Sequence, residues 1–148
     1  MTEQHNLARF VNAQEGVYGS ALNEIKNGKK TSHWMWYIFP QIQGLGYSDT
    51  AVKFAIRNKR EAAEYLQHPI LGSRLVEISS ALLNLDTSNA AEVFGHVDSL
   101  KLKSSMTLFS LLENTNPVFQ QVLDKFYRGE KDNNTLFLLN PHDPSKLK

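Results

Sequence analysis

Hydrophobic residues recur at steps of three and four over the first part of the chain, from Leu7 to Ile25. This spacing forms the apolar stripe of an amphipathic helix about 20 residues long. Asn27 and Gly28 follow the stripe, and glycine readily adopts the left-handed conformation that often ends a helix. The pattern therefore predicts one long helix that ends at Asn27 and Gly28.

The next segment, from Thr31 to Pro40, is rich in aromatic and branched residues. Such residues are common in buried strands, so a strand is one interpretation. A short helix is the other, because Ser32 can cap its start and Pro40 would end it. The helix is favoured because no partner strand is evident elsewhere in the sequence.

Capping residues and apolar residues at helical spacing predict the remaining elements. Ser48 and Asp49 begin one helix, and the capping-box spacing of Asn58 and Glu61 begins another that ends at Gln67. Further helices are predicted to begin at Pro69, at Thr87 or Ser88, at Asp98, at Asn116 and Pro117, and at Asp132 or Asn133. The sequence thus predicts an all-α fold, a single compact domain of about seven or eight short helices. Its core is expected over residues 5–139, with a mobile tail over residues 140–148.

Composition narrows the class of protein without identifying a reaction. Hydrophobic residues make up 41% of the 148 residues and charged residues 21%, which excludes a disordered or collagen-like chain. The formal charge of +1 gives no broad electrostatic field for nucleic acid or an anionic membrane. Cysteine is absent, so disulfides and thiolate chemistry are excluded. The longest apolar run, Trp34 to Pro40, is far shorter than the roughly 20 residues of a membrane helix, and a cytoplasmic location is expected.

The strongest candidate site is the aromatic segment. Trp34, Trp36 and Phe39 lie close together in the sequence, with His33 before them and Gln41 after them. A helix of six residues cannot turn every one of its aromatic rings inward. One interpretation is a dense part of the core, and the other is a pocket in which one or two rings stack on a base, a sugar or an apolar ligand. His33 is then the first candidate for a general acid or base, because histidine side chains exchange protons near neutral pH.

A second candidate lies further along the chain, where Lys101 and Ser105 share a helix face at a spacing of four residues. A serine–lysine pair serves nucleophilic catalysis if the lysine is desolvated and loses its proton. Asp98 sits one turn before Lys101. The plainer interpretation is that Asp98 caps the helix and pairs with Lys101 on the surface.

Anion binding is a third possibility. The Gly44–Gly46 loop and the helix start at Ser48 and Asp49 offer backbone and hydroxyl donors. This loop lacks the further residues of a dinucleotide fingerprint or a P-loop, so an ordinary turn is the alternative. Arg74 follows another helix start and could also bind an anion, although a solvent-exposed arginine is the usual outcome.

Metal and nucleic-acid sites are not indicated. The five histidines are scattered, and none of the spacings typical of zinc sites occurs. Basic residues form two small clusters, one around Lys26, Lys29 and Lys30 and one over residues 53–60. Clusters of this size are typical of solvated helix ends, so we expect neither a metal nor a nucleic-acid partner.

Several separate motifs occur in the order found in one known bacterial family. They are the runs Gly28 to Gln41, Gly44 to Ser48, Tyr65 to Leu75, Phe94 to Gly95, Asp98 with Lys101 to Phe109, and Leu123 to Phe126 with Gly129, Asp132 and Thr135. Over roughly residues 5–139 the chain resembles the family called domain of unknown function 1810. The resemblance implies a compact, mainly helical fold. It implies no established reaction, because the members of the family are uncharacterised.

Two hypotheses of function follow from these residues. In the first, a pocket lined by aromatic rings binds a small phosphorylated or nucleotide-like ligand, and the cofactor, if any, is not indicated. The ligand-binding candidates are Trp34, Trp36, Gln41, Ser48, Arg74 and Asp98, and the catalytic candidates, should the protein be an enzyme, are His33, Lys101 and Ser105. In the second, the aromatic residues form an exposed patch for docking a protein, such as a second copy in a homodimer, without catalysis. A cavity with convergent polar groups supports the first hypothesis, and a flat exposed aromatic patch supports the second.

Overall fold

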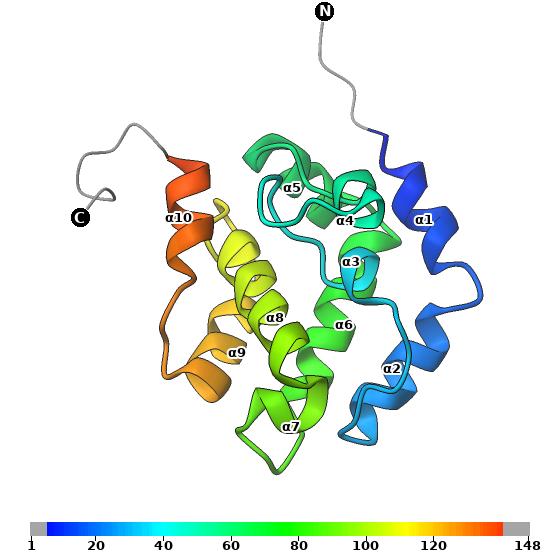
Figure 1. Cartoon of the computed structure of the whole chain (residues 1–148), viewed down its shortest axis with the longest axis vertical. Coiled ribbons are helices and arrows are strands. Elements are labelled where there is room, and N and C mark those ends of the chain that lie inside the picture. Colours follow the sequence, from blue (N-terminus) through cyan, green and yellow to red (C-terminus); the bar gives the residue numbers. More distant parts are fainter. Residues whose placement is uncertain (1–5, 141–148) are drawn as a thin grey trace, which may run out of the picture.

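A computed structural model describes residues 6–140 of the chain, and these residues form ten helices (Figure 1). The helices are α1 (Ala8–Gln14), α2 (Tyr18–Lys26), α3 (Met35–Ile38), α4 (Asp49–Lys53), α5 (Lys59–Gln67), α6 (Leu71–Leu83), α7 (Ala90–Phe94), α8 (His96–Ser110), α9 (Val118–Tyr127) and α10 (Asn133–Leu139). The described residues contain no strand apart from one isolated bridge between Ile42 and Ile56. The predicted all-α class is therefore confirmed. Of the predicted tail, only Asn140 lies within the described residues.

The predicted number of helices, seven or eight, is too low. The long first helix is in fact two helices, α1 and α2, which are separated at Gly16. Gly16 has a φ of +74°, a conformation that ends a right-handed helix and that glycine adopts without strain. The hydrophobic stripe continues across this break because both helices turn apolar residues toward the same core. Because the hydrophobic spacing is the same on both sides of Gly16, spacing alone gives no indication that the helix ends there.

Several helix starts that carry a polar cap were predicted correctly, but the cap of α7 is Asn89 and not Thr87 or Ser88. The Ser48 side chain accepts a hydrogen bond from the Ala51 backbone at the start of α4, and Asn58 accepts one from the Glu61 backbone at the start of α5. These bonds satisfy backbone donors that have no partner inside the helix. The one-turn helix α3 confirms the helical interpretation of the aromatic segment, although Ser32 does not cap it.

The longest helix, α8, runs through the middle of the molecule. Figure 1 shows α8 with α9 and α10 on one side and α6 on the other, while α1 and α2 lie along the far side of α6. Its second half is buried on every side, because all residues from Ser104 to Phe109 are buried. Two of the three hydroxyl groups in this stretch bond to the helix backbone, Ser104 to the Leu100 carbonyl oxygen and Thr107 to the Lys103 carbonyl oxygen, whereas the Ser105 hydroxyl has no partner within the described chain.

An ion pair ties α1 to the start of α5. Arg9 Nη1 lies 3.0 Å from the Glu61 carboxylate, and the Glu61 side chain is fully buried. The same guanidinium donates hydrogen bonds to the backbone carbonyl oxygens of Lys53 and Ala55, at the end of α4. Through these bonds α1 fixes the position of α4, which forms one wall of the site described below. Within residues 6–140, no helix combines the length and the apolar character needed to cross a membrane.

Candidate functional site

Two neighbouring segments and a third that lies far from them in the sequence enclose a recess of about 310 Å³. They are the segment that leads into α3, the start of α4, and the first turns of α8. The recess, called here the lysine recess, is lined by Lys30, His33, Trp34, Met35, Trp36, Tyr37, Ser48, Thr50, Asp98 and Lys101. Six of the nine residues that the sequence singled out therefore share one hollow, and both His33 and Lys101 are among them.

The segment before α3 is held in place by a single carboxylate. Glu24 of α2 accepts hydrogen bonds from the backbone N–H groups of Thr31 and Ser32, from the Ser32 hydroxyl, and from Nε1 of Trp34. Burial by itself would raise the pKa of Glu24, but these four bonds outweigh burial and lower the pKa to about 2. This segment carries His33 and Trp34 to the recess, so Glu24 determines where they lie.

The centre of the recess is a carboxylate between two ammonium groups. Asp98 Oδ2 lies 2.9 Å from Lys30 Nζ, and Asp98 Oδ1 lies 3.2 Å from Lys101 Nζ. Burial tends to raise the pKa of Asp98, and the hydrogen bonds and charges of the two lysines reverse this and lower it. The predicted cap at Asp98 is wrong, since Gly95 occupies the N-cap position of α8 and the Asp98 side chain turns to the lysines. Its predicted pairing with Lys101 is confirmed.

Lys30 is the residue of this site that the sequence analysis missed. It was interpreted as part of a solvated helix end, yet its side chain is only 6% exposed. Its ammonium group lies 4.9 Å from the centre of the Trp34 ring and also donates to the Ser32 carbonyl oxygen. No local pattern links Lys30 to Asp98, because 68 positions separate them in the sequence. Thr50, an exposed residue that also lines the recess, was missed as well.

The two tryptophans have different positions. Trp34 is 1% exposed and packs against Phe39 and Phe94, so it belongs to the aromatic core and forms the base of the recess. Trp36 is half-buried, and Lys101 Nζ lies 4.5 Å from the centre of its ring. Ammonium groups are attracted to the face of an indole ring. Because Trp36 is half-buried and Trp34 is buried, Trp36 is the tryptophan whose ring is available to a ligand.

The structure as a whole places three predicted site residues outside the lysine recess. Gln41 lines a smaller, separate recess on which Trp36 also borders. Ser105 is fully buried on α8, so it has no access to solvent and does not face the recess with Lys101. Arg74 lies on α6, where it donates a hydrogen bond to Gln14 and stacks on the Tyr18 ring, and it supports the packing of α6 against α2. Helical spacing predicted a shared face for Lys101 and Ser105 but not the depth of burial along that face.

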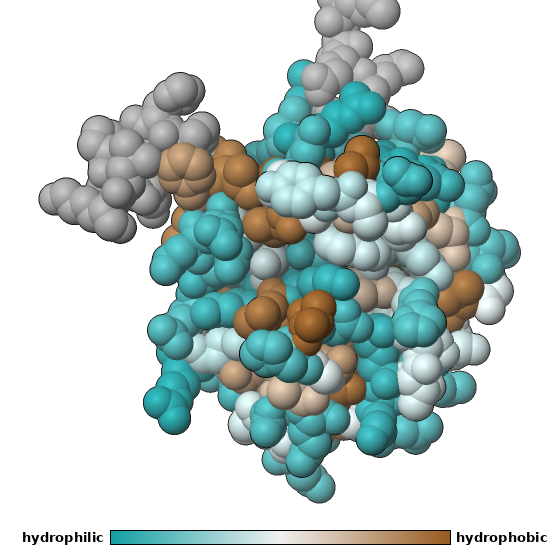
Figure 2. All heavy atoms as spheres, in the orientation of Figure 1, coloured by the Kyte–Doolittle hydropathy of each residue, from teal (hydrophilic) through white to brown (hydrophobic). Residues whose placement is uncertain are grey.

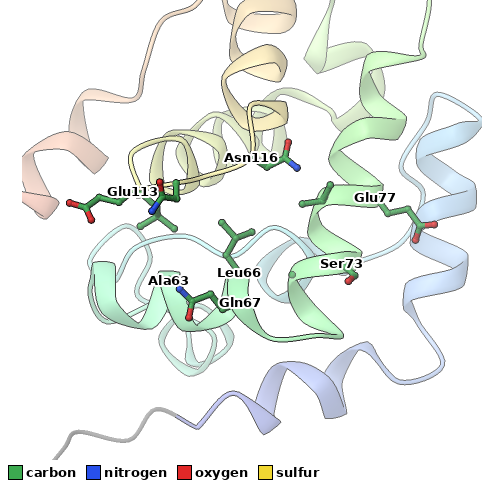
Figure 3. Close-up of a pocket in the computed structure, with 11 residues that line it drawn as sticks. Ala63, Leu66, Gln67, Ser73, Glu77, Glu113 and Asn116 are labelled. Carbon is green, nitrogen blue, oxygen red and sulfur yellow. The ribbon is translucent and has the colours of Figure 1, made fainter.

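A larger hollow lies elsewhere in the described chain. It has a volume of about 680 Å³ and lies between α5, α6 and the segment that joins α8 to α9. Figure 3 shows Ala63, Leu66 and Gln67 of α5 across from Glu113 and Asn116. Its lining contains two glutamates and no lysine, arginine or histidine. This hollow is therefore unsuited to an anionic ligand, although it is more than twice as large as the lysine recess.

The aromatic segment does not form a flat docking patch. Trp34 and Phe39 are buried, and Trp36 and Tyr37 are half-buried. In Figure 2 the hydrophobic residues of the visible face form small separate groups with hydrophilic residues between them, and one group lies at α10. The geometry thus matches a recess with convergent polar groups. In the described part of the chain, no group of three or more histidine, aspartate or glutamate side chains is placed to hold a metal ion.

Comparisons with known proteins agree with the fold and assign no activity. The model of the family described as "Protein of unknown function (DUF1810)" matches residues 4–139. The chain is also similar to the conserved hypothetical protein Rv1873 from Mycobacterium tuberculosis, which has a crystal structure. The two sequences are 45% identical, and the comparison of the two structures gives a TM-score of 0.88. That match covers 90% of this chain and 95% of the other. No curated protein matches the sequence.

Proposed function

The chain belongs to the DUF1810 family, whose description gives no activity, and from its own geometry we propose that the lysine recess binds a small phosphorylated ligand. The observation that carries this proposal is the pair of ammonium groups that share one carboxylate. Two positive charges and one negative charge leave the recess with one net positive charge. A phosphoryl group would balance that charge, so the charge of the recess favours an anion over a cation.

Unused hydrogen-bond donors point to the same class of ligand. An ammonium group has three N–H donors, and Lys101 uses one of them on Asp98. The Ser48 oxygen accepts from the Ala51 backbone, but its hydroxyl hydrogen can still be donated. The Thr50 hydroxyl and the His33 ring line the same recess and are exposed. A phosphoryl group has several acceptor oxygens and can accept from all of these donors, whereas a carboxylate has only two oxygens.

The size of the recess limits the ligand. Binding sites for small molecules typically span about 300–1,000 Å³, and the lysine recess, at about 310 Å³, lies at the lower end. A sugar phosphate or a single nucleotide suits this volume better than a dinucleotide. The half-buried Trp36 ring adds an apolar face beside the charged end of such a ligand. The proposal concerns binding, and His33 is the residue we would test first for proton transfer if a reaction is found.

Ribose 5-phosphate is a suitable probe, with ribose as the control that lacks the phosphate. Titration calorimetry should detect binding of ribose 5-phosphate and not of ribose. The protein contains only two tryptophans, and both border the recess, so a change in tryptophan emission on binding reports on this site. Lys101→Met should weaken binding about ten-fold or more, because it removes a charge-assisted hydrogen bond.

Lys103→Met is the matched control. Lys103 lies on the same helix but faces the Tyr127 ring, outside the recess. It should leave the affinity unchanged. The proposal is contradicted if ribose 5-phosphate causes no heat or emission change at millimolar concentration, or if the Lys101 and Lys103 variants weaken binding equally.

A further inference from the structure

A second, more enclosed recess adjoins the first on the other side of Trp36. It has a volume of about 180 Å³, and we call it the Gln41 recess. Its walls are largely apolar side chains, such as Ile42, Ala51 and Val52, and none of its lining residues is charged. A group that enters this recess must therefore be uncharged. At about 30 Å³ per water molecule in the liquid, the volume equals about six waters, which is the scale of one small ring system.

Gln41 is the polar group of this recess that lacks a partner. Its side chain is buried, with 3% of the residue exposed, and its Nε2 atom has no hydrogen-bond partner within the described chain. Buried amide groups are nearly always paired, because an unpaired one loses its bonds to water without replacement. Gln41 is also one of the residues that line this recess. The unpaired donor and the cavity together indicate an acceptor that arrives from outside the chain.

The backbone holds Gln41 in a fixed position. Its carbonyl oxygen accepts a hydrogen bond of 2.8 Å from the Ile56 backbone, and the Ile56 carbonyl oxygen accepts one of 2.8 Å from Gln43. These two bonds form the isolated bridge that joins the loop after α3 to the segment after α4. The backbone of Gln41 is thus in place before any ligand binds, which lowers the entropic cost of binding.

Trp36 and Gly46 fix the wall between the two recesses. A Cβ atom at Gly46 would lie 2.7 Å from the edge of the Trp36 ring and 2.8 Å from the Ala51 side chain. Only glycine allows the loop to approach the ring this closely. The ring therefore stands between the lysine recess and the Gln41 recess, and it borders both.

We infer that the Gln41 recess receives an uncharged planar base of the same ligand, through a carbonyl oxygen that accepts from Gln41 Nε2. The ligand is then a nucleoside monophosphate, with its phosphate in the lysine recess and its base beyond Trp36. This inference rests on the proposed function, since the phosphate must occupy the lysine recess. It specifies the base of the ligand, which the two lysines do not bind.

The test compares uridine 5′-monophosphate with ribose 5-phosphate, which share the phosphate and the sugar and differ in the base. The unmodified protein should bind the nucleotide at least about five-fold more tightly than ribose 5-phosphate. Gln41→Met should remove this advantage and leave the affinity for ribose 5-phosphate unchanged. Gln121→Met, at an exposed glutamine on α9 that lines neither recess, should change neither affinity.

Folding of the Gln41 variant is checked by urea unfolding. The midpoint should stay the same or rise, because the Nε2 atom has no hydrogen bond to lose. The inference is overturned if the two ligands bind equally well to the unmodified protein, or if Gln41→Met keeps the preference for the nucleotide. In both cases the proposed function stands, because ribose 5-phosphate still binds. If neither ligand binds at millimolar concentration, the proposed function and the inference both fail.

Discussion

Replacement of Glu24 by glutamine tests how the segment before α3 is held. Of the two carboxylate oxygens, Oε1 accepts three hydrogen bonds and Oε2 accepts one from the Ser32 hydroxyl. A glutamine keeps the oxygen that accepts three bonds, and its amide group can donate to Ser32 instead. Glu24→Gln therefore removes the charge and leaves the geometry nearly unchanged.

The magnitude follows from the pKa of Glu24. The four hydrogen bonds lower it from 4.5 to about 2, and each unit is worth about 1.36 kcal/mol. A full conversion gives about 3.4 kcal/mol, but the side chain is partly exposed, so solvent screening reduces the expected cost of Glu24→Gln to about 2 kcal/mol at pH 7. The stabilising effect is present above pH 4.5, where Glu24 is ionised in the folded and unfolded chain alike. It is lost as the pH falls toward 2, because the folded state then also takes up the proton.

Urea unfolding at several pH values between 2 and 7 measures this difference directly. The free energy of unfolding should differ between the two proteins by about 2 kcal/mol at pH 7, and the difference should shrink toward zero near pH 2. Glu130→Gln, at an exposed glutamate, should show no such trend. A difference that is constant over this pH range, or absent at pH 7, would refute the role assigned to the charge of Glu24.

Two further predictions concern the recess and the core. Asp98→Asn should lower the free energy of unfolding by about 2 kcal/mol, because it leaves the nearly buried Lys30 ammonium without its counter-charge. The same variant should bind ribose 5-phosphate at least as tightly as the unmodified protein, and weaker binding by the folded variant in calorimetry would contradict this. Gly72→Ala should cost more than 3 kcal/mol in urea unfolding, because its Cβ would lie 1.9 Å from the Leu66 carbonyl oxygen. Gly19→Ala, which meets open space in α2, is the control and should be neutral or stabilising.

Local signals in the sequence were enough to predict most of the fold. The capped helix from Lys59 to Gln67 has the same bounds in the structure as in the prediction, because its cap at Asn58 and the proline after His68 both act within a few residues. The break at Gly16 was missed because a glycine inside a continuous hydrophobic stripe gives a weak signal. The spacing of hydrophobic residues indicates which side of a helix is apolar, but it does not indicate whether two successive stretches form one helix or two.

The candidate site was predicted in part, for a related reason. Residue type alone was enough to select His33, Trp36 and Lys101 as candidate site residues, because polar, charged and aromatic groups that lie close together are costly to bury in a core. The depth of each side chain depends on packing between distant segments, which spacing does not encode. Ser105 is therefore buried out of reach, and Lys30, which looked like a solvated helix end, lies at the centre of the recess.

A crystal structure of the protein with uridine 5′-monophosphate would show directly where the phosphate lies. We expect the phosphate in the lysine recess, with its oxygens within about 3 Å of Lys101 Nζ, the distance of charge-assisted hydrogen bonds. Electron density for the nucleotide in the hollow between α5 and α6, or a complex in which Lys30 and Lys101 contact only Asp98, would contradict it.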